Sequence, residues 1–354
     1  MHIRLGYVAT ALKLGKTVTS SSTVTYSTYT KQSTDRDKLE KLQKVAVSNV
    51  NDLYKILEYT VRNNIHFYRI TSALIPLATH PEVTDWEFRR ILKKDFEWLG
   101  NFINNNNLRV DTHPDEFNVL NSSKEEVIKT TERNLWHHAN LFQDINYPLG
   151  KMVLHIGGKE GGKLAATERF FKNFYNLPKE LTELLIFEND DKSFTTKEVL
   201  TICQEINAPM VLDVHHHNCN SGGDELEPML KDIFATWEGQ PLPPKLHFSS
   251  PKAGEKDKKH ADYIDAASFI EFVEKCIPLG IDLDIMLEAK QADFALYRLV
   301  DEIKNLKPEW NWIDNSTFSP IESSELIECS ELIESSEAIE SSEPIESSES
   351  LPTL

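Results

Sequence analysis

Histidines and carboxylates recur in this sequence at the ends of short apolar runs. In VLDVHHH, a run that ends at Asp213 is followed by three histidines, of which the second is His216. Imidazole nitrogens and carboxylate oxygens together hold ions such as Zn²⁺ and Mn²⁺ in proteins. The predicted ligands are His113, His155, Glu188, Asp213, His216, His247, His260 and Glu288. Carboxylates buried together repel one another and lose hydration, so the pattern favours bound cations.

The size of this ligand set predicts more than one ion. Five imidazoles and three carboxylates exceed the needs of one tetrahedral ion and suit two or three ions bridged by carboxylates. Nitrogen and oxygen ligands without thiolates favour Mn²⁺ or Zn²⁺ over Ca²⁺ or Mg²⁺. Such a cluster can polarise a phosphate, supply hydroxide near neutral pH and stabilise the leaving oxygen of an in-line displacement. The residues therefore predict phosphodiester hydrolysis.

Eight short runs of apolar, β-branched or aromatic residues carry these side chains. The runs span residues 3–8, 66–71, 108–113, 151–158, 184–190, 209–216, 245–250 and 283–290. Helical stretches separate them, and strands that alternate with helices pair in parallel. Eight such units suit a closed (β/α)8 TIM barrel better than an open doubly wound sheet, and no GxGxxG follows the first run. In a barrel, all the strand ends point at one rim, where the ligands would meet.

Charge is unevenly distributed along the 354 residues, which have a formal net charge of −18. Residues 321–350 repeat a hexamer, IESSEx, and hold ten glutamates, so the remainder carries −8. This tail accumulates no apolar face, and we expect it to be disordered, outside a nuclease domain that spans residues 1–315. No apolar stretch reaches the length of a signal peptide or a membrane span, and the cysteines are scattered. We therefore expect a cytoplasmic protein with free thiols and no membrane contact.

The motifs around these positions resemble those of the UV damage endonucleases, bacterial and fungal repair enzymes that cut DNA beside a photoproduct. They are ATHPEV, THPDEF, LHIGG, ENDD, DVHHH, KLHFSSP, HADYID and LEAK, which occur in this order between residues 1 and 306. The resemblance implies a TIM barrel related to endonuclease IV, with a manganese cluster at its mouth. It also implies cleavage of double-stranded DNA immediately 5′ of cyclobutane pyrimidine dimers, 6-4 photoproducts and abasic sites.

The same resemblance implies roles for individual residues. The eight predicted ligands hold the metals, Glu188 also being catalytic, and His80 lies near the scissile phosphate. Family members carry a carboxylated lysine at the place of Lys245, where a carbamate would act as an anionic ligand. Further residues are expected at the DNA or the lesion: Tyr7, Thr10, Glu116 and Phe117.

This chain departs from the family pattern in two of the loops. Some members insert Gln-Tyr into the duplex where this chain has Glu116-Phe117, and the first loop often holds Asn where this chain has Thr10. An anionic Glu116 beside the DNA backbone is unexpected. Phe117 is the apolar candidate for a wedge at the lesion, and the alternative is that it packs under its loop as core.

Two other functions fit parts of the pattern. A metal-dependent sugar isomerase or epimerase on the same barrel also needs carboxylates, histidine and divalent ions, but has little use for five ligand histidines. A DNA-binding barrel without catalysis would not need the ligand set. The expected partner is damaged double-stranded DNA, with no protein partner and a monomeric chain. His215 and His217 could equally support the ligands or face solvent.

Overall fold

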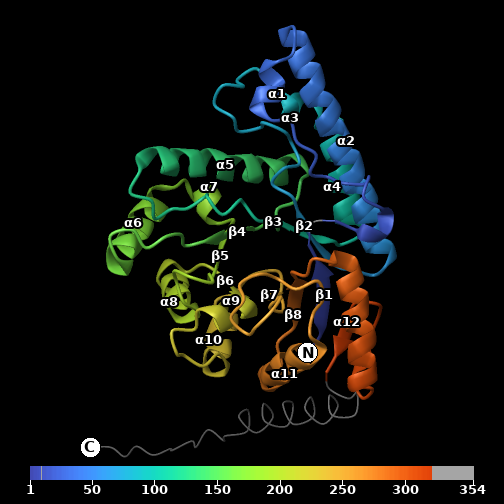
Figure 1. Cartoon of the computed structure of the whole chain (residues 1–354), viewed down its shortest axis with the longest axis vertical. Coiled ribbons are helices and arrows are strands. Elements are labelled where there is room, and N and C mark those ends of the chain that lie inside the picture. The colour runs from blue at the N-terminus through green and yellow to red at the C-terminus, as the bar shows by residue number, and fades with distance from the viewer. Residues whose placement is uncertain (9, 321–354) are drawn as a thin grey trace, which may run out of the picture.

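Parallel strands form the centre of the computed structural model, which describes residues 1–8 and 10–320 (Figure 1). Each lies within a run predicted from the sequence: β1 Ile3–Tyr7, β2 Phe67–Ile70, β3 Arg109–Thr112, β4 Met152–His155, β5 Leu185–Glu188, β6 Met210–Asp213, β7 Lys245–Phe248 and β8 Leu283–Leu287. The predicted acidic tail, residues 321–350, lies outside the described residues.

The strands lie in the order in which they occur in the chain, except that β1 lies next to β8: β2-β3-β4-β5-β6-β7-β8-β1. Every pair of neighbours in this order is parallel. β1 and β2 meet at a single parallel bridge between Val8 and Arg69. On the side away from β8, the start of β1 also pairs with β10 (Thr317–Ser319), which pairs with β9 (Asn311–Trp312), both antiparallel. The fold is therefore mixed α/β with a parallel sheet in the predicted strand order, and full closure into a barrel stays a prediction.

Helices connect the strands and surround the sheet (Figure 1). They are α1 Tyr26–Thr30, α2 Asp35–Arg62, α3 Phe88–Ile91, α4 Lys93–Asn105, α5 Glu125–Asp144, α6 Lys163–Asn176, α7 Lys179–Thr182, α8 Thr196–Ile206, α9 Val214–Cys219, α10 Leu230–Ala235, α11 Ala266–Cys276 and α12 Ala292–Leu306. Local sequence explains several of their ends. Thr34 caps α2, and Thr195 begins α8 with a capping box that Glu198 completes. Asn207 ends α8 in the left-handed conformation.

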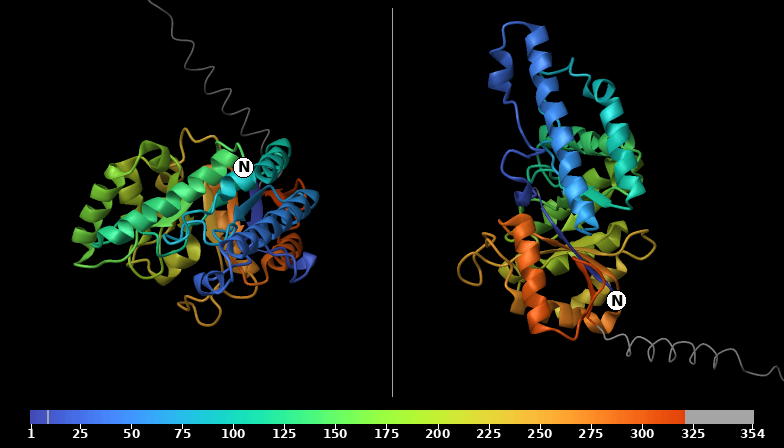
Figure 2. Two further views of the ribbon diagram at one scale, coloured as in Figure 1. Left: turned by 90° about the horizontal axis from the view of Figure 1, so that it is seen from above. Right: turned by 90° about the vertical axis from the view of Figure 1, so that its right-hand side faces the viewer.

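The first βα connection is longer than the others. The amino-terminal part of α2, with α1 beside it, extends beyond the strands (Figure 2). Fully buried side chains in α2 begin at Leu42, and before it Leu39 packs against the core while only partly buried. Fully buried Asn49 fastens this connection by hydrogen bonds to the backbone of Ser22 and Leu74.

Apolar side chains lie below the predicted ligands on the same face of three strands. Three side chains on β4, β5 and β6 pack with Trp237 in a small buried cluster: Val153, Ile186 and Val211. Each lies two residues before a predicted metal ligand, and residues two apart on a strand share a face. The apolar cluster therefore supports the ligands from below. Gly6 is required on β1, because a Cβ there would come within 2.6 Å of the Phe67 ring.

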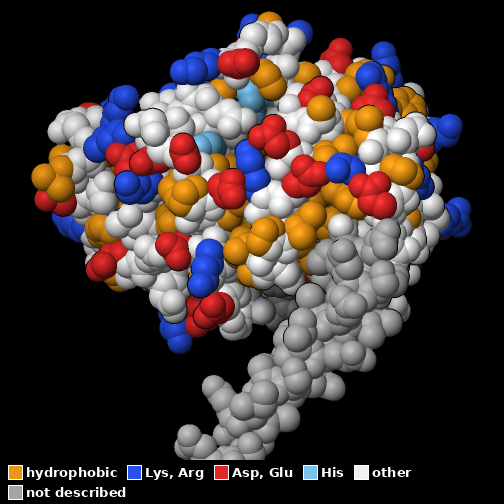
Figure 3. All heavy atoms as spheres, turned by 90° about the horizontal axis from the view of Figure 1, so that it is seen from below, with side chains coloured by type: hydrophobic (Ala, Val, Ile, Leu, Met, Phe, Trp, Pro, Cys, Tyr) orange, Lys and Arg blue, Asp and Glu red, His pale blue; other side chains and the backbone are white. Residues whose placement is uncertain are grey.

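Charged side chains of both signs lie on the face of the molecule that is seen from below (Figure 3). On the face in Figure 3, acidic and basic side chains of the described residues are interspersed, so this face shows no basic patch of the kind that binds nucleic acid. Among residues 1–8 and 10–320, no helix is both long and apolar enough to cross a lipid bilayer.

Candidate metal centre

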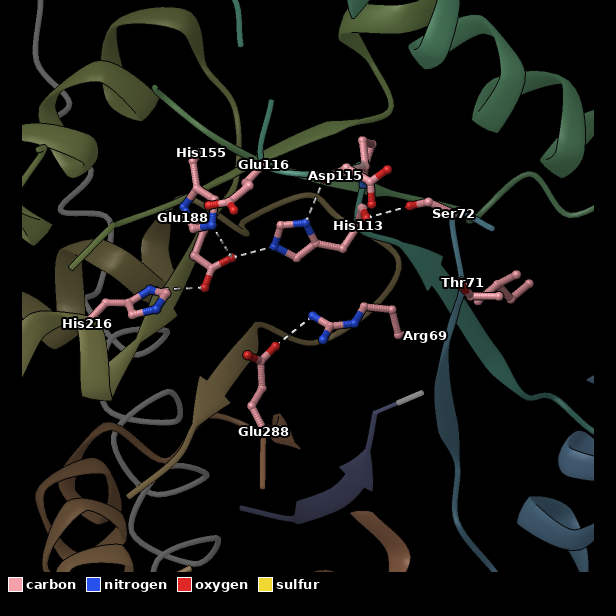
Figure 4. A pocket seen from close by; sticks show the side chains of 12 residues that line it. Arg69, Thr71, Ser72, His113, Asp115, Glu116, His155, Glu188, His216 and Glu288 are labelled. Carbon is pink, nitrogen blue, oxygen red and sulfur yellow. Dashed lines mark hydrogen bonds and ion pairs between the residues drawn. The ribbon is translucent and has the colours of Figure 1, made fainter. Parts of the chain in front are cut away.

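The carboxylate of Glu188, at the end of β5, lies among imidazoles from four other strands and loops (Figure 4). His113 Nε2 is 3.0 Å from one oxygen, Oε2, and His247 Nδ1 is 3.0 Å from the other, Oε1. His216 Nδ1 is 3.5 Å from Oε1, and His155 Nε2 is 3.7 Å from Oε2. The structure thus gathers predicted ligands from distant parts of the sequence around one buried carboxylate.

Two groups of these side chains are each able to hold a metal ion. One is His113, His155 and Glu188, and the other is Glu188, Asp213 and His247; within each group the ligand atoms lie within 4.8 Å of one another. Glu188 belongs to both groups.

Unpaired polar atoms in the same place also fit a metal centre. Among the described residues, Asp213 Oδ2, His155 Nδ1 and His247 Nε2 are buried and make no hydrogen bond. Buried polar atoms in native proteins almost always have a partner, so such atoms indicate a missing ion or water.

The last two predicted ligands are His260 and Glu288, and Glu288 follows β8. Its Oε1 is 3.4 Å from His247 Nδ1, and its Oε2 is 3.9 Å from His260 Nδ1. His260 also hydrogen-bonds the backbone oxygen of Glu288 at 2.7 Å. All eight predicted ligands therefore lie at one rim, while their individual roles stay predictions.

A helix cap positions His216. β6 ends at Asp213, whose side chain accepts a hydrogen bond of 2.8 Å from the backbone N–H of His216 and so begins α9. The chain turns here instead of continuing as the predicted strand, and the turn directs the His216 ring toward Glu188 (Figure 4). His215 and His217 are both buried: the first contacts the His260 ring edge-on, and the second pairs with Thr196. They support the rim and do not face solvent.

Burial and mutual charge shift the pKa values of these groups. Burial alone would raise the pKa of Glu188, but His247 and His155 hold it well below its ordinary value. Burial lowers the pKa of both His155 and His247, and the charge of Glu188 opposes that shift. Burial raises the pKa of Asp213. Glu188 is therefore held ionised, in the state that a metal ligand requires, whereas burial favours the protonated form of Asp213.

Lys245 lies fully buried at the start of β7, two residues before His247. Its Nζ donates a hydrogen bond of 2.5 Å to Asp111 Oδ2 on β3. Burial lowers the pKa of Lys245, and Asp111 partly opposes that shift. The side chain therefore has a carboxylate partner in the sheet, and its carboxylation stays a prediction.

A cavity of about 330 Å³ opens beside the ligands and takes in part of the third loop. Glu116 lines it, and the neighbouring Phe117 is 59% exposed, which rules out its alternative as core. Thr10 is half-buried in the first loop.

Two further residues were expected near DNA; Tyr7 is buried, and the role of His80 near the scissile phosphate stays a prediction. Tyr7 is completely buried, and its hydroxyl hydrogen-bonds Thr60 at 2.9 Å, so this side chain offers no surface to DNA. Tyr7 is the last residue of β1, and Thr60 of α2 covers its hydroxyl, which explains the burial. His80 stacks on Tyr26 of α1, with ring centroids 4.1 Å apart, and is not among the residues that line the cavity.

Arg69 on β2 is a site residue that sequence reasoning missed. Its Nη1 donates a hydrogen bond of 2.6 Å to Glu288 Oε1, and it lines the cavity. The sequence did offer a signal: Arg69 lies near the end of the run HFYRIT, and the predicted ligands lie near the ends of their own runs. Arg69 also lies two residues after Phe67, and residues two apart on a strand share a face. A search limited to metal-ligating residue types passes over an arginine.

Comparison with known proteins agrees with this geometry. A family model described as UV-endonuclease UvdE matches residues 3–315. A UV DNA damage endonuclease of Halalkalibacterium halodurans is 36% identical over 305 residues, covering 86% of this chain and 94% of that protein. One of Bacillus cereus is 34% identical over 308 residues, covering 87% and 96%.

Solved structures show the same likeness. The crystal structure of SacUVDE superposes with a TM-score of 0.76 at 33% identity, covering 86% of this chain and 99% of that one. A D-tagatose 3-epimerase-like protein has a TM-score of 0.50 at 16% identity, covering 71% and 91%, which shows a shared fold alone. The chain belongs to the UV-endonuclease UvdE family.

Proposed function

We propose that this chain is a metal-dependent endonuclease that cuts the DNA backbone immediately 5′ of ultraviolet lesions. The substrates are cyclobutane pyrimidine dimers, 6-4 photoproducts and abasic sites in double-stranded DNA, and the scaffold is a closed TIM barrel. The observation that carries the proposal is the buried Glu188 carboxylate, shared by two groups of possible ligands in a member of the UvdE family.

The donor set suits two or three divalent ions, Mn²⁺ foremost, with Zn²⁺ the alternative at one site. Bound ions would supply charge to a phosphate and lower the pKa of water for attack on phosphorus. His113, His155 and Glu188 would hold one ion, and Glu188, Asp213 and His247 would hold a second. The remaining ligands at the rim are His216, His260 and Glu288.

The protein itself holds the metal ligands in position and presents a side chain to the lesion. The cap between Asp213 and His216 and the bond from His260 to the Glu288 backbone fix these side chains before substrate binds. Exposed Phe117, on the loop directly after His113, is the proposed wedge that fills the gap left by an extruded lesion. Glu116 beside it faces the same cavity.

Incubation with an end-labelled duplex tests the proposal. A duplex that carries one cyclobutane dimer should give a single nick 5′ of the dimer when Mn²⁺ is present, with a 3′ hydroxyl and a 5′ phosphate. The same duplex without the dimer should stay intact, as should both duplexes in EDTA. An intact dimer duplex at every tested concentration of Mn²⁺ and Zn²⁺ would show that the proposed activity is wrong. A cytoplasmic location and a monomeric chain stay predictions.

A further inference from the structure

The guanidinium of Arg69 places a positive charge in a cavity that is otherwise lined by acidic residues and histidines. Four acidic residues line this cavity, Asp115, Glu116, Glu188 and Glu288, together with three histidines. Arg69 is the one lysine or arginine among the described residues that line it. Figure 4 shows its side chain reaching from β2 toward Glu288, across the cavity from His155 and His216.

The position of Arg69 is set by the sheet. Its backbone pairs with Asp111 of β3 on one side and forms the bridge to Val8 on the other. The side chain is only 17% exposed, and Nη1 is held at 2.6 Å from Glu288 Oε1. A side chain fixed in this way presents its donors in one orientation, as binding sites built on strands do.

A fixed positive charge is not needed to hold metal ions, and close to them it repels them. The negative charge of Glu288 does not explain the presence of Arg69, because a bound metal ion would also neutralise that charge. A guanidinium does match an anionic ligand: it is planar and carries five N–H donors in a fork that fits phosphate. The Nη1 bond to Glu288 uses one of these donors.

We propose that Arg69 binds the phosphodiester that is to be cut, by donating hydrogen bonds to its non-bridging oxygens while Glu288 holds the guanidinium in place. This assignment rests on the proposed function. One cavity is lined both by Arg69 and by His113, His155 and Glu188, so a phosphate between them meets the arginine and the metal ligands together. The arginine thus recognises the backbone at the cut and contributes no base recognition.

The test removes the arginine and the phosphate charge separately. Two duplexes each carry one cyclobutane dimer, with either a phosphate or a neutral methylphosphonate at the linkage 5′ of the dimer. Fluorescence anisotropy gives the Kd of the full-length protein for each duplex in EDTA, where no strand is cut. Wild-type protein should prefer the phosphate duplex. Arg69→Gln should weaken binding of the phosphate duplex about tenfold and leave the methylphosphonate duplex within about twofold, so that the preference disappears.

Two further variants control for folding and for general loss of charge. Arg69→Lys keeps a positive charge without the fork and should retain part of the preference. Arg89→Gln removes an arginine of α3 that pairs with Asp144 outside the cavity, and it should keep the whole preference. If Arg69→Gln does not fold, the comparison of Arg69→Lys with wild type decides: an undiminished preference contradicts the proposal.

Two results would overturn the assignment. Arg69→Gln could keep the wild-type preference, or it could weaken both duplexes equally, which would assign the arginine to holding Glu288. Cleavage by wild-type protein in Mn²⁺ separates this inference from the proposed function. If wild type does not nick the dimer duplex, the proposed function fails; if it does nick and the preference survives in Arg69→Gln, the role of Arg69 alone is wrong.

Discussion

Lys245 and Asp111 form an ion pair inside the sheet, with Nζ 2.5 Å from Oδ2 and both side chains almost completely shielded from solvent. Removal of one partner from such a pair leaves an uncompensated buried charge. Asp111→Asn should therefore lower the free energy of unfolding by about 3–5 kcal/mol, as measured by guanidinium denaturation in EDTA. The matched control is Asp35→Asn, which breaks a pair between exposed Asp35 and Lys38 and should leave the free energy of unfolding nearly unchanged. Equal stability of Asp111→Asn and wild type would show that Lys245 has another partner.

The wedge prediction depends on the exposure of Phe117. Phe117→Ala should leave the melting temperature within about 1 °C, because a side chain that is 59% exposed contributes little to the core. It should lower the binding preference for irradiated over intact duplex while metal content is unchanged. Phe170→Ala removes a fully buried ring of α6 and should cost about 3–5 kcal/mol, which calibrates the assay. Unchanged lesion preference in Phe117→Ala would place the wedge elsewhere.

A histidine on α5, away from the metal ligands, predicts a pH dependence of stability. Burial lowers the pKa of His137 from about 6.5 to about 4, so the folded protein keeps this ring neutral. The unfolded chain takes up a proton near pH 6.5, so the stabilisation from His137 is complete above that pH and is lost as the pH falls toward 4. The free energy of unfolding should therefore fall between pH 6.5 and 4 by up to about 3 kcal/mol from this group alone.

Comparison with a variant isolates that contribution from the carboxylates and histidines of the metal centre. In His137→Leu, the decline between pH 6.5 and 4 should be shallower than in wild type, with both proteins measured in EDTA. Parallel curves for the two proteins would mean that His137 is protonated in the folded state.

Strand ends were predictable because alternation fixes which residues share a face. The ligands His113, His155, Glu188 and His247 follow directly from that rule and from the parallel order of the runs. Distances between strands depend on how the sheet curves, and no local pattern reports them. The contacts of Glu288 with Arg69 and of Lys245 with Asp111 join strands far apart in sequence, and for that reason they were not predicted.

Other differences come from short or covered segments. β9 and β10 have two and three residues, too few to show a pattern; β10 pairs with β1, and β9 pairs with β10. Tyr7 looked available because it ends a strand, but Thr60 of α2 covers its hydroxyl. The turn at Asp213 depends on one hydrogen bond from its side chain to the next helix.

The central claim is that Glu188 links two metal ions which drive cleavage of the DNA backbone. Its most direct test is the single-turnover rate of nicking by Glu188→Gln on an irradiated duplex in Mn²⁺, with the melting temperature as a check on folding. The substitution keeps the size of the side chain and removes its charge, so the rate should fall at least about 100-fold, because charge stabilisation by metals underlies catalysis. A folded Glu188→Gln variant that nicks within about threefold of the wild-type rate would contradict it.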